Sequence, residues 1–173
     1  NQQFNREMNL LIIGDKDAGK TSLMQRYIMN SFDDELKGAT DIWHKQERLS
    51  NDTIMKINIY DQEVYNMADK HCIIICYDTS DLKSFENIDK HRQRVKEYGK
   101  HDAIIMLVGC KSDKTKHGRT EFERRAQYVD GDSWKKYNTA YVECSAKTGD
   151  NVRNVFIAAA ESVLLKGTRH KRT

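Results

Sequence analysis

The sequence predicts a single α/β domain: a six-stranded, mostly parallel sheet with one antiparallel edge strand and helices on both faces. Short apolar, β-branched runs alternate with amphipathic stretches along the chain, which is the pattern of βαβ units in a parallel sheet. Two of these runs are separated only by residues 50–52, too few for a crossover helix, so their strands should form a hairpin. A length of 173 residues suits one domain with a buried core.

The apolar runs and the amphipathic stretches predict the elements one by one. Strands are expected at residues 8–13, 42–49, 53–60, 71–78, 104–109 and 140–144. Helices are expected at residues 21–30, 84–98, around 134–137, and 152–165. In the last helix, apolar side chains recur at helical spacing and should pack on the sheet: Val152, Val155, Phe156, Ala159 and Val163. This divides the chain into an N-terminal extension (1–7), the domain (8–165) and a basic tail (166–173).

Composition and charge exclude several classes of protein. The chain has no proline, which excludes collagen-like and proline-rich sequences, and its net charge is only +3 with both signs interspersed. We therefore expect no nucleic-acid partner. The apolar runs are too short to span a membrane. Four cysteines without a CxxC pair lie in or beside strand runs, which favours buried, reduced thiols of a cytoplasmic protein over a disulfide framework: Cys72, Cys76, Cys110 and Cys144.

Basic residues gather in the tail at Lys166, Arg169, Lys171 and Arg172. One interpretation is a solvated terminus. The other is the lead-in to a lipidated segment that is missing from this sequence, which would give peripheral membrane contact.

The clearest motif is residues 14–21, GDKDAGKT, which match G-x-x-x-x-G-K-[ST] between a predicted strand and a predicted helix. In such a loop, backbone amides and the helix N-terminus surround a polyphosphate, a lysine reaches the outer phosphates and a hydroxyl ligates Mg²⁺. The candidate nucleotide-binding residues here are Asp17, Ala18, Gly19, Lys20, Thr21 and Ser22. A glycine-containing turn that matches the motif by chance remains the alternative.

Two later segments follow predicted strands: Cys110-Lys111-Ser112-Asp113 and Ser145-Ala146-Lys147. They resemble the guanine-reading Asn-Lys-x-Asp and Ser-Ala-Lys loops of Ras-superfamily small GTPases. The stretch from Arg26 to Asp33 is most similar to the Rab branch.

The resemblance implies a small G domain that binds GDP or GTP with Mg²⁺. Asp113 would accept two hydrogen bonds from guanine, Ala146 would donate its N–H to the guanine carbonyl, and the stems of Lys111 and Lys147 would cover the base. Further implied roles are a guanine-flanking Phe32, the metal-binding residues Thr21, Thr40 and Asp61, and the catalytic residues Lys20 and Gln62.

Three departures from the family pattern concern the γ-phosphate and the base. Asp61 is followed at once by Gln62, without the usual glycine, and the short segment before the next strand predicts a helix that is cut down or lost. The family's switch threonine falls on Ala39 unless one inserted residue brings Thr40 to its place. Cys110 replaces an asparagine, which should weaken nucleotide binding by about 1 kcal/mol without abolishing it.

The sequence thus predicts a monomeric Rab-like GTPase with slow or absent intrinsic hydrolysis that regulates vesicle or membrane traffic. Effector, exchange and activating proteins would bind its switch regions. A non-switching pseudo-GTPase that serves as an interaction module is the second hypothesis. An ATP-using phosphate-loop protein is the third, although it leaves the two base-side segments unexplained.

Overall fold

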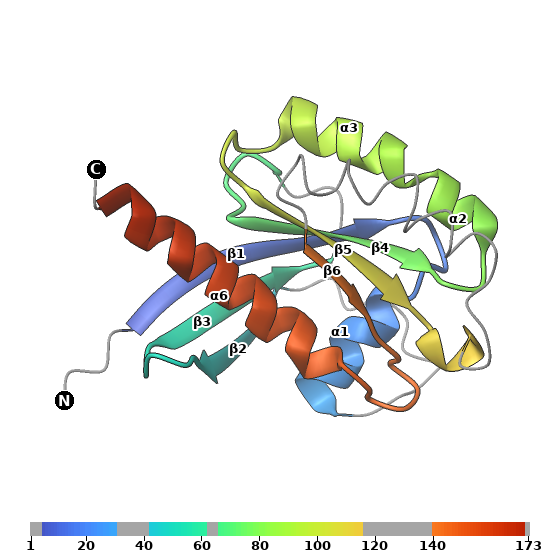
Figure 1. Ribbon diagram of the computed structural model, residues 1–173, viewed down its shortest axis with the longest axis horizontal. Helices are drawn as coiled ribbons and strands as arrows, with labels where there is room; N and C mark the ends of the chain where they lie inside the picture. The colour runs from blue at the N-terminus through green and yellow to red at the C-terminus, as the bar shows by residue number, and fades with distance from the viewer. Residues whose placement is uncertain (1–4, 31–41, 62–65, 116–139, 172–173) are drawn as a thin grey trace.

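The computed structural model describes residues 5–30, 42–61, 66–115 and 140–171. Its centre is a six-stranded sheet with the order β2-β3-β1-β4-β5-β6 (Figure 1). Only the β2–β3 pair is antiparallel, so the predicted hairpin and the mostly parallel sheet are confirmed. The strands are β1 (Asn5–Gly14), β2 (Trp43–Arg48), β3 (Ile54–Tyr60), β4 (Cys72–Asp78), β5 (Ile104–Cys110) and β6 (Ala140–Glu143).

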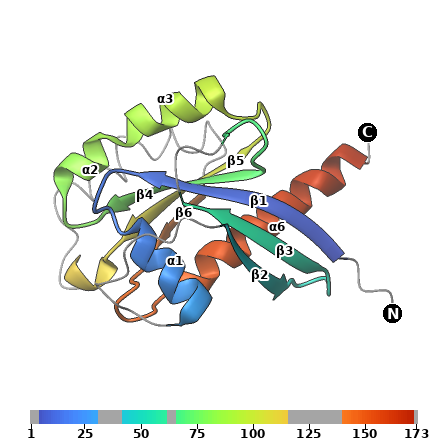
Figure 2. The same ribbon diagram turned by 180° about the vertical axis from the view of Figure 1, so that it is seen from behind.

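Helices cover both faces of the sheet, as predicted. Helices α1 (Lys20–Met29) and α6 (Val152–Lys171) pack on one face, and α2 (Leu82–Glu86) and α3 (Ile88–Tyr98) on the other (Figures 1 and 2). A short 3₁₀ helix, η1 (Ser112–Thr115), follows β5. Within the described residues, no helix combines the length and the apolar sequence needed to cross a membrane.

Strand β1 is the middle of the core because it is buried on both faces. Leu10 and Ile12 point into a cluster with Phe156 of α6, while Leu11 and Ile13 point into a cluster with Val95 of α3. This alternation follows from the two-residue period of a strand. A parallel strand covered by helices on both sides therefore has a continuous apolar sequence.

Three element boundaries differ from the prediction. Strand β1 begins at Asn5 because residues 5–7 pair with β3, so the expected extension at 1–7 was too long. Helix α6 continues past Leu165 to Lys171, so most of the expected tail is helical. The single helix predicted at 84–98 is two helices that meet at Asn87, whose side chain is engaged elsewhere, as described below.

The segment between β3 and β4 is described only at Asp61 and at residues 66–71. Residues 66–71 form a turn in which the buried Met67 joins the α3-side core, and they contain no helix. Several predictions lie outside the described residues: the helix around 134–137, Phe32, Ala39, Thr40 and Gln62.

A core substitution tests the contact between α1 and α6. Phe156 is fully buried and stacks on Tyr27 with 3.9 Å between ring centroids. Phe156→Ala should lower the free energy of unfolding by about 3–5 kcal/mol in urea titrations, because removing the ring would leave a cavity between α6 and the sheet. Leu165→Ala, at a side chain that is 61% exposed on the same helix, should change it by about 0.5 kcal/mol or less. Equal losses from the two variants would contradict this packing.

Candidate functional site

A cleft of about 490 Å³ opens at the carboxyl edge of the sheet, where open α/β sheets bind ligands. The β1–α1 turn, η1 and the β6–α6 turn meet at this end of the molecule (Figure 1). The cleft is lined by Asp17, Gly19, Lys20, Thr21, Ser22, Leu23, Cys110, Lys111, Asp113, Lys114, Cys144, Ala146 and Lys147. All three segments singled out in the sequence, residues 14–21, 110–113 and 145–147, therefore contribute to one cavity.

The loop from Gly14 to Gly19 depends on two glycines with positive φ. A Cβ atom at Gly14 (φ +151°) would lie 2.5 Å from the carbonyl oxygen of Cys76, and one at Gly19 (φ +103°) would lie 3.0 Å from Cys110 Cβ. Lys20 Nζ donates to the carbonyl of Gly14 at 2.7 Å across the loop. No side chain caps α1 at Gly19, so the amides of its first turn are left for an anion.

Two charged residues inside the loop, Lys16 and Asp17, are exposed. Solvent screens the Asp17 carboxylate there, which weakens its repulsion of a phosphate in the cleft. The backbone of Asp17 is left-handed (φ 67°), a conformation that aspartate tolerates better than most residues. Ala18 is buried and its N–H donates to Asp15 O at 3.1 Å, so Ala18 does not line the cleft.

Asp15 anchors the back of the loop to α3. Its carboxylate accepts hydrogen bonds from Asn87 Nδ2 at 2.6 Å and pairs with His91 Nε2 at 2.7 Å. Burial alone would raise the pKa of Asp15, but these two partners lower it below its ordinary value. The start of the loop is therefore tied to α3 and to Asn87, the residue between α2 and α3.

On the base side, Lys111 ties the two loops together. Its Nζ donates to the backbone carbonyl of Asp17 at 2.8 Å and to Asp78 Oδ2 at 2.9 Å. Burial favours protonation of Asp78, but hydrogen bonds from Ser80 and Lys111 hold its pKa below the ordinary value. The hydroxyl of Thr79 donates to Cys110 O at 2.8 Å and fixes the same turn from β4.

Ser145 orients Asp113 from behind. Its hydroxyl donates to Asp113 Oδ1 at 2.7 Å, and its side chain is buried at 1% exposure. The predicted Ser145 thus lies outside the cleft lining and acts through the carboxylate. Asp113 itself keeps lone pairs for a ligand in the cleft.

Arg26 of α1 fixes the loop that contains Ala146 and Lys147. Its Nε donates to Ala146 O at 2.6 Å, and one terminal nitrogen donates to Lys147 O at 2.7 Å. Bonds from a guanidinium are charge-assisted and hold two carbonyls in one geometry. Sequence analysis missed this contact because the partners lie 120 and 121 residues apart along the chain.

Three buried thiols underlie the base side of the cleft. Hydrogen bonding to Cys110 and burial both raise the pKa of Cys144 far above its ordinary value. The pKa of Cys110 is also raised, because contact with Cys76 and burial outweigh the opposing effect of Cys144. Burial thus favours the neutral thiol at Cys110 and Cys144, and all four cysteines are buried and free of disulfides.

Asp61, at the end of β3, fits a role in holding a hard cation. Its Oδ1 is buried without a hydrogen-bond partner among the described residues. Burial raises the pKa of Asp61, while the charge of Lys20 opposes that shift. The described residues hold no cluster of three or more His, Cys, Asp or Glu suited to a metal. One carboxylate and the Thr21 hydroxyl instead match Mg²⁺, which takes few protein ligands besides phosphate oxygens.

A strand–loop–helix phosphate motif facing a carboxylate loop, both at the carboxyl edge of a mostly parallel sheet, defines a phosphate-loop nucleotide-binding domain. The family model described as "Ras family" matches residues 9–165. The chain belongs to the Ras family, as the sequence motifs predicted.

Its relatives include Rab proteins. The chain is 30% identical to the Ras-related protein Rab-26 of Rattus norvegicus over 92% of its own length and 65% of the relative's. It is 28% identical to Rab-26 of Drosophila melanogaster, covering 98% of this chain and 46% of the relative. It is 28% identical to the GTP-binding protein YPTM2 of Zea mays, covering 94% of this chain and 83% of the relative. The chain therefore spans less than two thirds of either Rab-26.

The structure brings most of the predicted ligand-contacting residues into one cleft and adds three. Leu23, Lys114 and Cys144 line it although the motifs did not single them out. Each directly precedes or follows a predicted site residue in the sequence, and this adjacency is the only sequence feature that points to them.

An exchange experiment tests the role of Arg26. Arg26→Gln removes the charged donors to Ala146 O and Lys147 O, so the adjoining loop should open more often. The amides of Thr148 and Gly149 should then exchange with deuterium about tenfold faster, corresponding to about 1.4 kcal/mol of lost local stability. Arg48→Gln, at an exposed arginine on β2, serves as the matched control and should leave these rates unchanged. Unchanged exchange in Arg26→Gln would refute the anchoring role.

Proposed function

We propose that this chain is a Rab-like G domain that binds GDP and GTP with Mg²⁺. The observation that carries the proposal is the single cleft in which the phosphate loop and Asp113 face one another. A phosphate loop alone would accept many nucleotides. Asp113, in the loop opposite it, would select those with a guanine base.

Base selection would rest on hydrogen-bond complementarity. Asp113 can accept from both the ring N–H and the exocyclic amine of guanine, whereas adenine presents an acceptor at the first of these positions. The fixed Ala146 backbone would donate to the guanine carbonyl. The stems of Lys111 and Lys147 would cover the ring faces, and Phe32 would flank the edge.

On the phosphate side, the amides at the start of α1 and the charge of Lys20 would hold the outer phosphates. Thr21 and Asp61, with Thr40 from the first switch, would hold Mg²⁺. When bound, the ion neutralises charge on the phosphates. Cys110 packs against the phosphate loop where the family has asparagine, and Lys111, at the position of the motif's lysine, bonds the Asp17 carbonyl of that loop.

Hydrolysis would be in-line attack of water on the γ-phosphate, with Lys20 stabilising the developing charge. Gln62 is the candidate for orienting that water. Because Gln62 directly follows Asp61 without the family's intervening residues, we propose slow intrinsic turnover that depends on a partner protein. The cellular role we propose is regulation of vesicle or membrane traffic by a cytoplasmic monomer, through effector, exchange and activating proteins and peripheral membrane contact.

One observation favours a second candidate, a nucleotide-bound interaction module that does not switch. The described residues 66–71 form only a turn where a helix is usual, so a nucleotide-dependent surface would be reduced there. Superimposable structures with GDP and with a GTP analogue would favour this module, and displaced switch regions would favour the GTPase.

The decisive experiment identifies the nucleotide that the purified protein carries. Heat-denatured protein should release GDP or GTP on ion-exchange chromatography, and EDTA should speed nucleotide release about tenfold or more by removing Mg²⁺. A single-turnover assay with γ-labelled GTP then measures hydrolysis. Absence of bound nucleotide, together with no binding of fluorescent GDP in Mg²⁺, would overturn the proposal.

A substitution of Asp113 tests base selection alone. Asp113→Asn replaces one acceptor oxygen by an NH₂ donor, which suits the extra carbonyl of xanthine and opposes the amine of guanine. Competition assays should show GDP binding weakened at least about a hundredfold, with xanthosine diphosphate now preferred. Asp89→Asn, at an exposed carboxylate on α3, is the control and should keep guanine preference. Unchanged preference in Asp113→Asn would refute the assigned role.

A further inference from the structure

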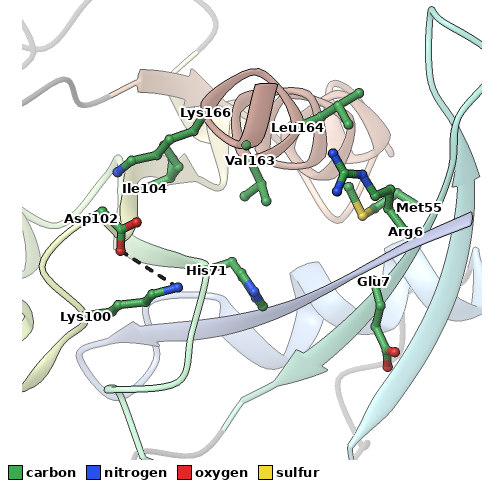
Figure 3. A pocket seen from close by; sticks show the side chains of 11 residues that line it. Arg6, Glu7, Met55, His71, Lys100, Asp102, Ile104, Val163, Leu164 and Lys166 are labelled. Carbon is green, nitrogen blue, oxygen red and sulfur yellow. Dashed lines mark ion pairs between the residues drawn. The ribbon is translucent and has the colours of Figure 1, made fainter. Parts of the chain in front are cut away.

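A second cavity lies at the opposite edge of the sheet, where β1, β4 and β5 begin (Figures 1 and 3). Its volume is about 210 Å³, less than half that of the candidate nucleotide cleft. Met55 and Ile104 contribute apolar walls. Cationic groups come from Arg6 of β1, Lys100 before β5, and Lys166 of α6. We call this cavity the basal pocket.

His71 is the most firmly fixed polar group of the basal pocket. Its N–H donates to Asn9 O and its carbonyl accepts from Ile104 N, both at 2.9 Å. Its ring Nδ1 accepts the N–H of Asn9, also at 2.9 Å. Because a proton on Nδ1 would oppose that N–H, the neutral ring carries its proton on Nε2. Burial and the charge of Lys100 lower the pKa of His71, so at neutral pH it offers one N–H donor.

The acidic residues of the basal pocket compensate its cations only in part. Glu7 points away from the cavity (Figure 3), accepts from Asn58 Nδ2 at 2.7 Å and pairs with Lys56 at 3.8 Å. Asp102 pairs loosely with Lys100 at 3.8 Å, and both side chains are about two-fifths exposed. The remaining cations of the pocket are Arg6 and Lys166.

Arg6 and Lys166 have no such compensation, since neither forms an ion pair with any of the described residues. The guanidinium of Arg6 lies close to α6 at Gly167, where an added Cβ would be 3.7 Å from its Nη2. Among the described residues, the basal pocket therefore has two cations without an ion pair, on either side of Val163 (Figure 3), and the fixed imidazole of His71.

We propose that the basal pocket binds a phosphate monoester, with Arg6 and Lys166 neutralising its charge and His71 Nε2 donating a hydrogen bond. A phosphate monoester carries about −1.5 to −2 charges at neutral pH, which two cations without an ion pair in the described part of the chain can offset. A guanidinium suits phosphate oxygens because it donates two parallel bonds. The small volume favours a simple phosphate group over a nucleotide. This site does not depend on guanine-nucleotide binding.

Two sources could present this group: a soluble phosphate or a membrane lipid with a phosphomonoester headgroup. The sequence after Lys166 contains Arg169, Lys171 and Arg172, and a basic segment of this kind would be attracted to anionic surfaces. The test therefore has a soluble arm and a membrane arm.

The soluble arm titrates inorganic phosphate into GDP-loaded protein and follows the His71 ring by NMR, assigned with His71→Gln. The ring signals should shift and saturate at millimolar phosphate. The double variant R6Q/K166Q should weaken binding at least about tenfold. Arg48→Gln, which loses the same kind of charge outside the pocket, should change it less than about twofold. Since the readout is local to His71, failure here is distinct from failure of guanine-nucleotide binding.

The membrane arm compares phosphatidylcholine vesicles containing phosphatidic acid with phosphatidylserine vesicles of equal surface charge. If the protein prefers phosphatidic acid and R6Q/K166Q abolishes that preference, the site binds a lipid headgroup. If the protein binds inorganic phosphate but shows no such preference, the site binds a soluble phosphate. The proposal is overturned if the His71 signals do not shift up to about 50 mM phosphate and no lipid preference appears. It is also overturned if R6Q/K166Q, folded by circular dichroism, binds phosphate as the parent protein does.

Discussion

The structure depends on the position of β1 between β3 and β4, in parallel pairing with both. This pairing buries the strand on both faces and brings its carboxyl end beside those of its neighbours. Gly14 then turns the chain where a Cβ would collide with the Cys76 carbonyl, so the phosphate loop can begin only where the strand ends. The cleft is therefore a consequence of sheet topology before any ligand is considered.

The loops around the cleft are held by contacts that cross between elements. Lys111 bonds the Asp17 carbonyl from the base side, and Asp15 is anchored to α3 from the other. In this family an asparagine usually joins the two loops, and this chain has Cys110 there, a buried thiol in contact with the phosphate loop. Lys111 matches the lysine of the same motif, so its bond to the Asp17 carbonyl still joins the two loops when the asparagine is replaced. The loss expected from Cys110 is the one hydrogen bond of the asparagine, about 1 kcal/mol.

Local pattern and spacing predicted the features that depend on nearby residues. The β2–β3 hairpin follows from a connection too short for a helix, and the phosphate loop from one contiguous motif. The Arg26 anchor, the Asn87–Asp15 bond and the pairing of Asn5 with Ile54 were not predictable in this way. Each joins residues far apart in sequence, and polar residues such as these have no periodic signature. Charged residues at the start of β1 also concealed its true beginning.

The same strand that carries the phosphate loop at one end carries Arg6 at the other. Between the two lie Leu10 to Ile13, which are fully buried and paired with β4, while Leu10 and Leu11 are also paired with β3. Coupling between distant sites requires an element with two discrete arrangements that both ligands bias. The described part of β1 shows one arrangement, paired with β3 and β4. A phosphate in the basal pocket would therefore affect the location of the domain, because it would add an attachment point beside α6. It would leave the affinity of the cleft for its nucleotide unchanged.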